Sequence, residues 1–275
     1  MDHVNVIIVG AGLSGVGAAA HLVEQCPEKT FTLLEGRAAV GGTWDLFRYP
    51  GIRSDSDMHT LGYSFKPWTQ AKSIADGPSI RDYVNETADE FDIRRHIRFD
   101  HKVQTASWDS TQSHWVLTSN LSDGSTTKIS GDFLFMCGGY YSYDDPHRPA
   151  FPGESRYQGQ ILHPQFWPED LDYDGKKVIV IGSGATAMTI VPSMTQKGAQ
   201  VTMVQRSPTY VVSRPAEDKI ANTLRKWLPE KWAYAITRLK NTTLSGYFYR
   251  QTRSQPAKTK AQLLGMATAN LGEEM

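Results

Sequence analysis

Short apolar runs alternate with helical patterns in the first part of the chain. Residues 4–9 form an apolar, β-branched run that ends at Gly10, which predicts a buried parallel strand. Residues 13–25 combine small side chains with helical spacing, and residues 31–34 form the next apolar run, which ends at Glu35. Strand, helix and strand in this order predict a βαβ unit.

The same pattern returns in the second half of the chain. Residues 178–181 predict a strand, residues 185–197 a helix and residues 201–204 a second strand. The two patterns lie 172 residues apart, counted from Gly10 to Gly182. We therefore expect an α/β fold with two Rossmann-like dinucleotide-binding domains, each built on a parallel sheet.

The connecting segments define the expected domain boundaries. Alternating positions predict a small β meander and one more buried strand, and residues 41–70 predict a functional loop region. Residues 146–168 are rich in Pro and Gly and predict a linker. The expected segments are a helix at 79–91, meander strands at 97–108, 114–119 and 126–130, a strand at 133–136, a first domain at 1–145, a linker at 146–168, and a second domain at 169–275 with helical character from about 219.

Composition excludes several classes of protein. Lys and Arg together number 29, as do Asp and Glu, so the net charge is zero and a chain built to bind nucleic acid is not expected. The two cysteines, Cys26 and Cys137, have neither metal-ligand nor dithiol spacing. No apolar run approaches the ~18 residues of a membrane span, and residues 1–5 lack a basic signal region. A cytoplasmic location is therefore the expectation.

The first glycine-rich turn, GAGLSG at residues 10–15, lies between a predicted strand and a predicted helix. Such glycines permit a tight turn, close approach of a pyrophosphate and close packing of the helix on the strand. Glu35 lies 20 residues beyond Gly15 at the end of the next strand, where a carboxylate binds ribose hydroxyls and repels a 2′-phosphate. This turn therefore predicts FAD or NAD binding, and a turn of the same shape without a ligand is the alternative.

The second turn, GSGATA at residues 182–187, has the same setting, and its alanine at the sixth position is a permitted variant. The strand that follows ends in Gln205, Arg206 and Ser207, without an acid. Arginine and a hydroxyl can hold a 2′-phosphate, so this turn predicts NADP(H), whereas a solvated surface charge is the alternative for Arg206. Two nucleotide sites with opposite ribose signals indicate a flavoprotein reduced by NADPH.

Two longer motifs carry a family resemblance. Residues 41–55, GGTWDLFRYPGIRSD, match the pattern [A/G]GxWxxxx[F/Y]P[G/M]xxxD at every fixed position, and residues 157–168 match FxGxxxHxxxWP with Tyr157 in place of Phe. The chain thus resembles the Baeyer–Villiger class of flavoprotein monooxygenases from about residue 4 to about residue 250. Trp167 favours this branch over the related N/S-oxygenating flavin monooxygenases.

The resemblance implies which residues bind the cofactors. Gly10, Gly12 and Gly15 belong to the first turn described above. Contacts with FAD are implied for Ser14, Glu35, Thr43, Trp44, Asp45, Leu46, Asp55 and Val103. Arg53, Ser54 and Asp55 would lie between the flavin and the nicotinamide, and NADP would bind at Gly182, Ser183, Gly184, Ala185, Thr186, Ala187, Met188, Arg206 and Ser207.

Some of these residues also have plain structural interpretations. An ordinary core aromatic is the alternative for Trp44. Asp55 is the implied catalytic residue, because in the family this aspartate pairs with a catalytic arginine beside the flavin, and a helix N-cap before Met58 is its alternative. For His163 we favour a structural role over proton transfer, because no acid–base partner is evident in the sequence.

The resemblance implies an NADPH- and O2-dependent FAD monooxygenase that converts ketones to esters, and oxygenates thioamide or sulfide sulfur, through a C4a-peroxyflavin. An N/S-oxygenating flavin monooxygenase and a non-catalytic dinucleotide-binding fragment are the alternatives. Family members run to nearly twice this length, so we expect the C-terminal part of the family fold, with its catalytic arginine, to be missing. No metal site is expected.

A basic stretch follows the second βαβ pattern. Residues 219–260 carry ten Lys and Arg residues and a single acid, Glu230, interleaved with Trp and Tyr. A weak peripheral contact with a membrane is one interpretation of this stretch. We favour a helical insertion whose aromatic side chains pack inward and whose charges are solvated.

Overall fold

The computed structural model describes residues 1–207 and 210–271, which form two compact units. The first unit comprises residues 1–49 and 77–171, and the second comprises residues 50–76 and 172–275. The domains expected from the sequence are continuous, whereas residues 50–76 belong to the second unit and separate two segments of the first. The boundaries at 145 and 169 remain predictions.

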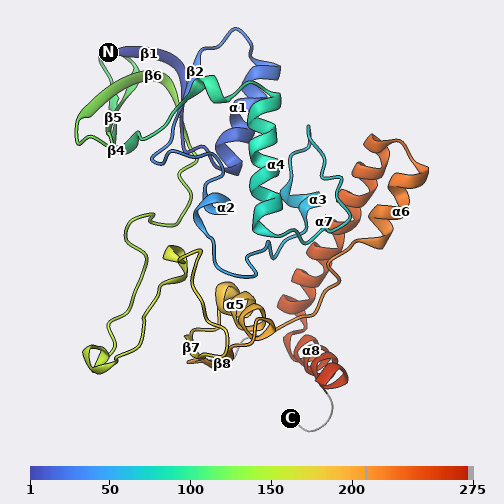
Figure 1. Ribbon diagram of the computed structural model, residues 1–275. Coiled ribbons are helices and arrows are strands. Elements are labelled where there is room, and N and C mark those ends of the chain that lie inside the picture. The colour runs from blue at the N-terminus through green and yellow to red at the C-terminus, as the bar shows by residue number, and fades with distance from the viewer. Residues whose placement is uncertain (208–209, 272–275) are drawn as a thin grey trace. The chain divides into compact units, whose positions relative to one another are not determined.

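The first unit is built on a six-stranded mixed sheet with strand order β3-β2-β1-β6-β5-β4 (Figure 1). Strands β2, β1 and β6 are parallel neighbours, and β6, β5 and β4 form an antiparallel meander. The elements are β1 (Asp2–Val9), α1 (Leu13–Gln25), β2 (Phe31–Leu34), α2 (Thr43–Leu46), α4 (Gly77–Glu90), the 3₁₀ turn η1 (Arg94–His96), β3 (Ile97–Arg98), β4 (Lys102–Asp109), β5 (His114–Asn120), β6 (Thr126–Met136), and the 3₁₀ turns η2 (Glu154–Arg156) and η3 (Pro164–Phe166).

The alternation of side chains in β1 explains why both faces of the sheet bury apolar surface. Ile7 joins Leu34, Leu117 and Ile129 in a core cluster on one face. Its neighbour Ile8 points to the other face and is fully buried. Such two-sided burial is typical of the central strand of a parallel sheet.

Two strand predictions need correction. Residues 97–108 form two strands, β3 and β4, because β3 pairs with β2 and β4 pairs with β5. The two runs 126–130 and 133–136 form one strand, β6. Gly131 makes this continuity possible, because a Cβ at this position would lie 2.7 Å from a side-chain carbon of Ile7 on the neighbouring strand.

The second unit pairs two parallel strands with a group of helices (Figure 1). Helix α5 packs on both strands, α6 and α7 form an antiparallel pair, and α3 packs on α7. The elements are α3 (Met58–Leu61), β7 (Lys177–Ile181), α5 (Ala185–Gln196), β8 (Gln200–Val204), α6 (Lys219–Trp227), α7 (Glu230–Ser254) and α8 (Pro256–Leu271).

The expectation that the aromatic side chains of residues 219–260 pack inward is wrong for most of them. Trp227 is 81% exposed and Trp232 is 65% exposed. The buried side of α7 carries smaller side chains, Ala233, Thr237 and Asn241, which let α3 and α6 approach closely. None of the helices in the described parts of the chain combines the length and the apolar character needed to cross a bilayer.

Candidate functional site

The first glycine turn is tightly built. Gly10 has a φ of +101°, and a Cβ there would lie 2.5 Å from the carbonyl oxygen of Cys137. A Cβ on Gly15 would lie 1.9 Å from the carbonyl oxygen of Gly10. Only glycine fits either position, and the backbone N–H groups at the start of α1 are left without a side-chain cap.

A second glycine pair lies directly against this turn. The amide of Gly41 donates to the carbonyl of Ala11 at 3.0 Å, and a Cβ on Gly42 would lie 3.0 Å from the Cα of Gly12. Gly41 and Gly42 both have positive φ, at 126° and 56°. The two glycine segments thus pack backbone against backbone beside the α1 N-terminus, an approach that a Cβ on Gly42 would block.

Glu35 is a buried charged residue beside the first glycine turn. It is only 2% exposed, and its two carboxylate oxygens accept hydrogen bonds from the amides of Ala11 at 2.7 Å and Arg37 at 3.0 Å. An ionised carboxylate has about four acceptor positions, so each oxygen can still accept a ribose hydroxyl. The uncapped N-terminus of α1 and the Glu35 carboxylate therefore fit the pyrophosphate and the adenosine ribose of a dinucleotide that lacks a 2′-phosphate.

The second turn shares two backbone hydrogen bonds with the first, the one from its first glycine to the neighbouring strand and the first one inside the helix. The amide of Gly10 donates to Leu34 O at 2.8 Å, and the amide of Gly182 donates to Val204 O at 2.8 Å. In each turn the third residue of the motif, Gly12 or Gly184, is the N-cap residue of the following helix. No side chain caps either helix. The repeat of the βαβ pattern predicted from the sequence is thus also a repeat of backbone geometry.

This equivalence places Gln205 where the first turn has Glu35. Arg206 and Ser207 follow and are exposed, and the Ser183 hydroxyl donates to Ser207 O at 3.5 Å. Gly182 has a φ of +125°, and no atom lies within 4 Å of a Cβ built there or on Gly184. The second turn is therefore open, lacks a carboxylate and offers a cation, which fits a 2′-phosphorylated ribose. The remaining predicted residues of this turn lie on α5: Ala185, Thr186, Ala187 and Met188.

The long sequence motif is divided between the two units. In the first unit Asp45 accepts hydrogen bonds from Arg37 at 2.7 Å and Arg48 at 2.8 Å, so its charge is neutralised by two guanidinium groups. Trp44 is half-buried rather than part of the fully buried core. The other predicted residues there are Ser14, exposed on α1, Thr43 and Leu46 on α2, and Val103, which packs against the core cluster from β4.

The second half of the motif lies against α5. A Cβ on Gly51 (φ +80°) would lie 2.0 Å from the Ser193 hydroxyl oxygen and 2.8 Å from the Thr189 carbonyl oxygen. Arg53, which follows closely, forms a β-bridge with Asp76. The structure therefore brings Arg53, Ser54 and Asp55 into the unit that carries the second glycine turn.

The helix N-cap suggested for Asp55 is occupied by another residue. Asp57 caps α3, because its carboxylate accepts from the Thr60 amide at 3.1 Å, and Asp55 is exposed. Four potential capping residues precede Met58, and the sequence alone did not distinguish them. His163 is also a cap, since its Nδ1 accepts from the Gln165 amide at 3.2 Å at the start of η3. Burial lowers the pKa of His163, in agreement with a structural role.

The sequence does not mark several polar residues that lie beside the first turn or bond to the segment 50–76. Tyr143 lies 3.7 Å from the Cβ position of Gly42, and burial raises its pKa, with the neighbouring Glu35 charge adding to this effect. In the second unit, Arg238 and Asn241 of α7 bond to the segment around His59. No sequence motif marks these contacts, because their partners lie far away along the chain. Within the described residues no cluster of three or more potential metal ligands occurs.

Comparison with known proteins gives consistent similarities. The chain matches the FMO-like family, described as flavin-binding monooxygenase-like, over residues 3–252. It is 52% identical over 273 residues to "FAD-containing monooxygenase EthA" of Mycolicibacterium smegmatis, covering 99% of this chain and 55% of that protein. The chain thus spans about half the length of the curated relatives it matches.

Solved structures of monooxygenases share the fold. An oxidised steroid monooxygenase bound to NADP superposes with a TM-score of 0.71 at 34% identity, over 85% of this chain and 43% of that one. The open structure of a cyclohexanone monooxygenase superposes with a TM-score of 0.68 at 28% identity, over 77% of this chain and 41% of that one. The α/β fold expected from the sequence is confirmed by these matches.

Proposed function

The chain belongs to the flavin-binding monooxygenase-like family, and we propose that it provides both dinucleotide sites of an FAD-containing, NADPH- and O2-dependent monooxygenase of the Baeyer–Villiger type. The observation that carries this proposal is the pair of equivalent glycine turns. The residues proposed to meet the ribose have opposite charges, Glu35 in the first turn and Arg206 in the second. Ketones are the proposed substrate class, with thioamide or sulfide sulfur as a second class.

The first turn is the proposed FAD site. The N-terminus of α1 would hold the pyrophosphate, since its unpaired amides and helix dipole favour negative charge. Glu35 would accept hydrogen bonds from the ribose hydroxyls, and the absence of side chains at Gly41 and Gly42 would let the flavin come close to the backbone. Further proposed contacts are Ser14, Thr43, Trp44, Asp45, Leu46 and Val103.

The second turn is the proposed NADP(H) site. The N-terminus of α5 would hold the pyrophosphate, and Arg206 with Ser207 would hold the 2′-phosphate. A glutamate at the position of Gln205 would repel that phosphate, and none is present. The proposed domains are accordingly 1–145 for FAD and 169–275 for NADP(H), joined by 146–168.

Arg53, Ser54 and Asp55 are assigned to the nicotinamide side, because their segment packs on α5 of the second turn. Asp55 is the proposed catalytic residue, whose exposed carboxylate would orient the cationic group that faces the flavin. FAD bound at the first turn would supply the redox chemistry with NADPH and O2. The residues of this chain would bind the two cofactors and interact with their charged phosphate groups.

The names of the similar proteins support this proposal. The mycobacterial relative is named FAD-containing, the steroid monooxygenase is bound to NADP, and the cyclohexanone monooxygenase is named for a ketone. The alternatives are an N/S-oxygenating flavin monooxygenase and a non-catalytic dinucleotide-binding chain.

Flavin analysis and product analysis of the purified protein test the proposal. We expect bound or reconstitutable FAD, NADPH-dependent O2 consumption, and an ester from 4-phenyl-2-butanone. A sulfoxide from methyl phenyl sulfide without any ester from the ketone would instead indicate the N/S-oxygenating class. FAD binding without NADPH oxidation would indicate the non-catalytic alternative, and a colourless protein that cannot be reconstituted would refute the proposal.

A further inference from the structure

Residues 50–76, called the motif segment below, contain the end of the long sequence motif. A small set of hydrogen bonds holds this segment on α7. The Arg238 guanidinium donates to the carbonyl oxygens of His59 at 3.2 Å and Thr60 at 3.1 Å. The Asn241 side-chain amide donates to Asp57 Oδ1 at 3.0 Å. The position of the segment that carries Arg53–Asp55 thus depends on contacts made more than 170 residues away in sequence.

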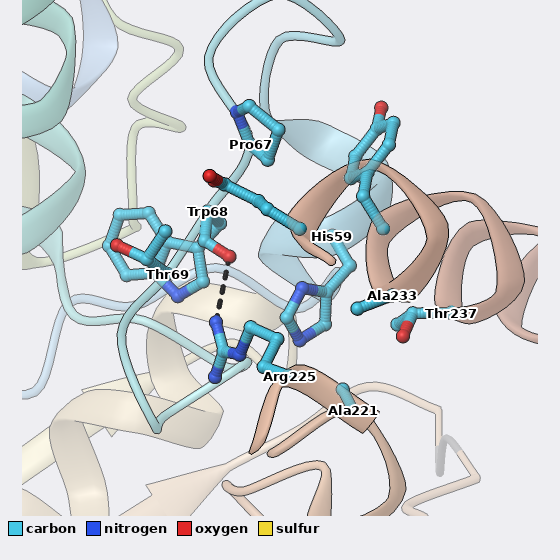
Figure 2. Close-up of a pocket in the computed structure, with 10 residues that line it drawn as sticks. His59, Pro67, Trp68, Thr69, Ala221, Arg225, Ala233 and Thr237 are labelled. Carbon is cyan, nitrogen blue, oxygen red and sulfur yellow. Dashed lines mark hydrogen bonds between the residues drawn. The ribbon is translucent and has the colours of Figure 1, made fainter. Parts of the chain in front are cut away.

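His59 lies at the centre of this attachment. Figure 2 shows its imidazole among side chains from three parts of the unit, Trp68 of the motif segment, Arg225 of α6 and Ala233 of α7. The residue is only 3% exposed. Neither the Nε2 atom of His59 nor the hydroxyl of Tyr234, which lines the same cavity, has a hydrogen-bond partner, although both atoms are buried.

The cavity has room for about one water molecule. A buried imidazole nitrogen without a partner is unfavourable, and buried water commonly satisfies such atoms. Thr69, Arg225 and Thr237 add polar atoms to the lining (Figure 2). The size and the polar lining of this cavity therefore fit a single bound water molecule.

The charged groups around His59 come from every element that packs on it. Asp57 belongs to its own segment, Arg225 and the helix-capping Asp218 belong to α6, and Lys240 belongs to α7. Arg238 bonds to the His59 carbonyl, and Glu230 lines the cavity. Burial is the largest influence and lowers the pKa of His59 below its usual 6.5, so the ring is neutral at pH 7.

We propose that this cavity binds one water molecule, which hydrogen bonds to Nε2 of a neutral His59, and that His59 is thereby a positioning residue holding the segment of Arg53–Asp55 on α6 and α7. Asp57 and Asp218 favour the protonated ring, but burial outweighs them, and Arg225 and Lys240 also oppose protonation. Protonation would therefore place an unfavourable buried cation in the attachment and loosen it. The consequence for NADP(H) binding rests on the function proposed above, whereas the water site and the attachment do not.

The sign of the pH effect follows from proton counting. When the segment detaches, His59 regains a pKa near 6.5, so the detached form binds more protons than the attached form below that pH. The attachment is therefore strongest above pH 6.5 and weakens as the pH falls toward the lowered pKa of the attached form. Below that lowered pKa it weakens no further.

NMR on the intact 275-residue chain tests the site without any cofactor. At pH 7 we expect a nuclear Overhauser effect between the His59 ring and a long-lived water, and a ring titration midpoint below 6.5. A ring that titrates at or above 6.5, or a cavity without a water contact, would overturn the proposal.

Two variants separate positioning from packing. His59→Gln keeps hydrogen-bonding capacity without titrating. Because intrinsic amide exchange slows as the pH falls, the comparison uses protection factors. Those of the Met58 and Thr60 amides should equal the wild-type values at pH 7 and should not show the loss that the wild type shows below pH 6.5. His59→Leu removes the hydrogen bond, and their exchange should be roughly tenfold faster at pH 7.

Retention of the wild-type pH dependence in His59→Gln would contradict the proposal, even if His59→Leu fails to fold. Binding of NADP+ is measured separately at pH 7.5 and 5.5. Its complete absence at both values would count against the proposed function, and the exchange and NMR results would still decide the positioning role.

Discussion

Replacement of Asp57 by alanine is a quantitative test of how α3 is held on α7. The Asp57 carboxylate accepts three hydrogen bonds, from the Thr60 amide at 3.1 Å, the Thr60 hydroxyl at 3.0 Å and the Asn241 amide at 3.0 Å. Loss of an N-cap costs about 1 kcal/mol. Asn241 is only 8% exposed and its side chain also bonds to Asp218, so the amide N–H that loses Asp57 as its acceptor adds about 1–3 kcal/mol.

We therefore expect Asp57→Ala to lower the free energy of local opening by about 2–4 kcal/mol. Native-state hydrogen exchange at the Thr60 amide and along α7 measures this opening locally, which suits a chain of two compact units better than a global melt. Ser56→Ala is the matched control, because Ser56 is exposed and bonds to Ser54 through its backbone, which the substitution keeps.

A double-mutant cycle isolates the carboxylate–amide pair. In an Asn241→Ala background the Asp57→Ala substitution should cost about 1–2 kcal/mol less, since no buried amide is left unpaired. Exchange in Asp57→Ala equal to that in Ser56→Ala would refute this reasoning, as would a cycle with no coupling.

Three further outcomes follow from the geometry. Gly15→Ala should destabilise the chain by roughly 1–3 kcal/mol, because its Cβ would lie 1.9 Å from Gly10 O, while Gly246→Ala in the open interior of α7 should stabilise it by roughly 0.5–1 kcal/mol; equal denaturant midpoints would contradict this. Arg206→Ala should weaken NADPH binding roughly tenfold and leave FAD binding unchanged, as measured by two separate titrations. Burial lowers the pKa values of His59, His96 and His163, so the unfolded chain binds more protons below pH 6.5, and the denaturant midpoint should fall between pH 7 and 5.5; a rise would contradict the sign.

Local sequence signals predicted the first βαβ unit almost residue by residue. The helix predicted at 13–25 and the strand predicted at 31–34 have those bounds in the structure. This agreement has a local cause, since apolar periodicity and the glycine turn act over a few residues. The strand β6 was divided in the prediction because Gly131 interrupts its pattern, and only the neighbouring Ile7 explains why glycine is needed there.

The attachment of residues 50–76 could not be predicted in the same way. Asp57 pairs with Asn241 across 184 positions, and His59 contacts Arg238 across 179. Neither α7 residue stands in a recognisable motif, and their roles arise only when tertiary packing removes them from water. The exposed aromatics of α6 and α7 show the same limit, because helical periodicity does not say which apolar side finds a partner.

Titration of the 275-residue chain with FAD, followed by flavin fluorescence, tests the central claim most directly. The account predicts saturable binding that Glu35→Gln weakens roughly tenfold or more, because an amide would replace a buried carboxylate oxygen that now accepts a backbone N–H, with Arg206→Ala binding FAD like the wild type. Absence of saturable binding, or wild-type FAD affinity in Glu35→Gln, would contradict the assignment of the first glycine turn to FAD.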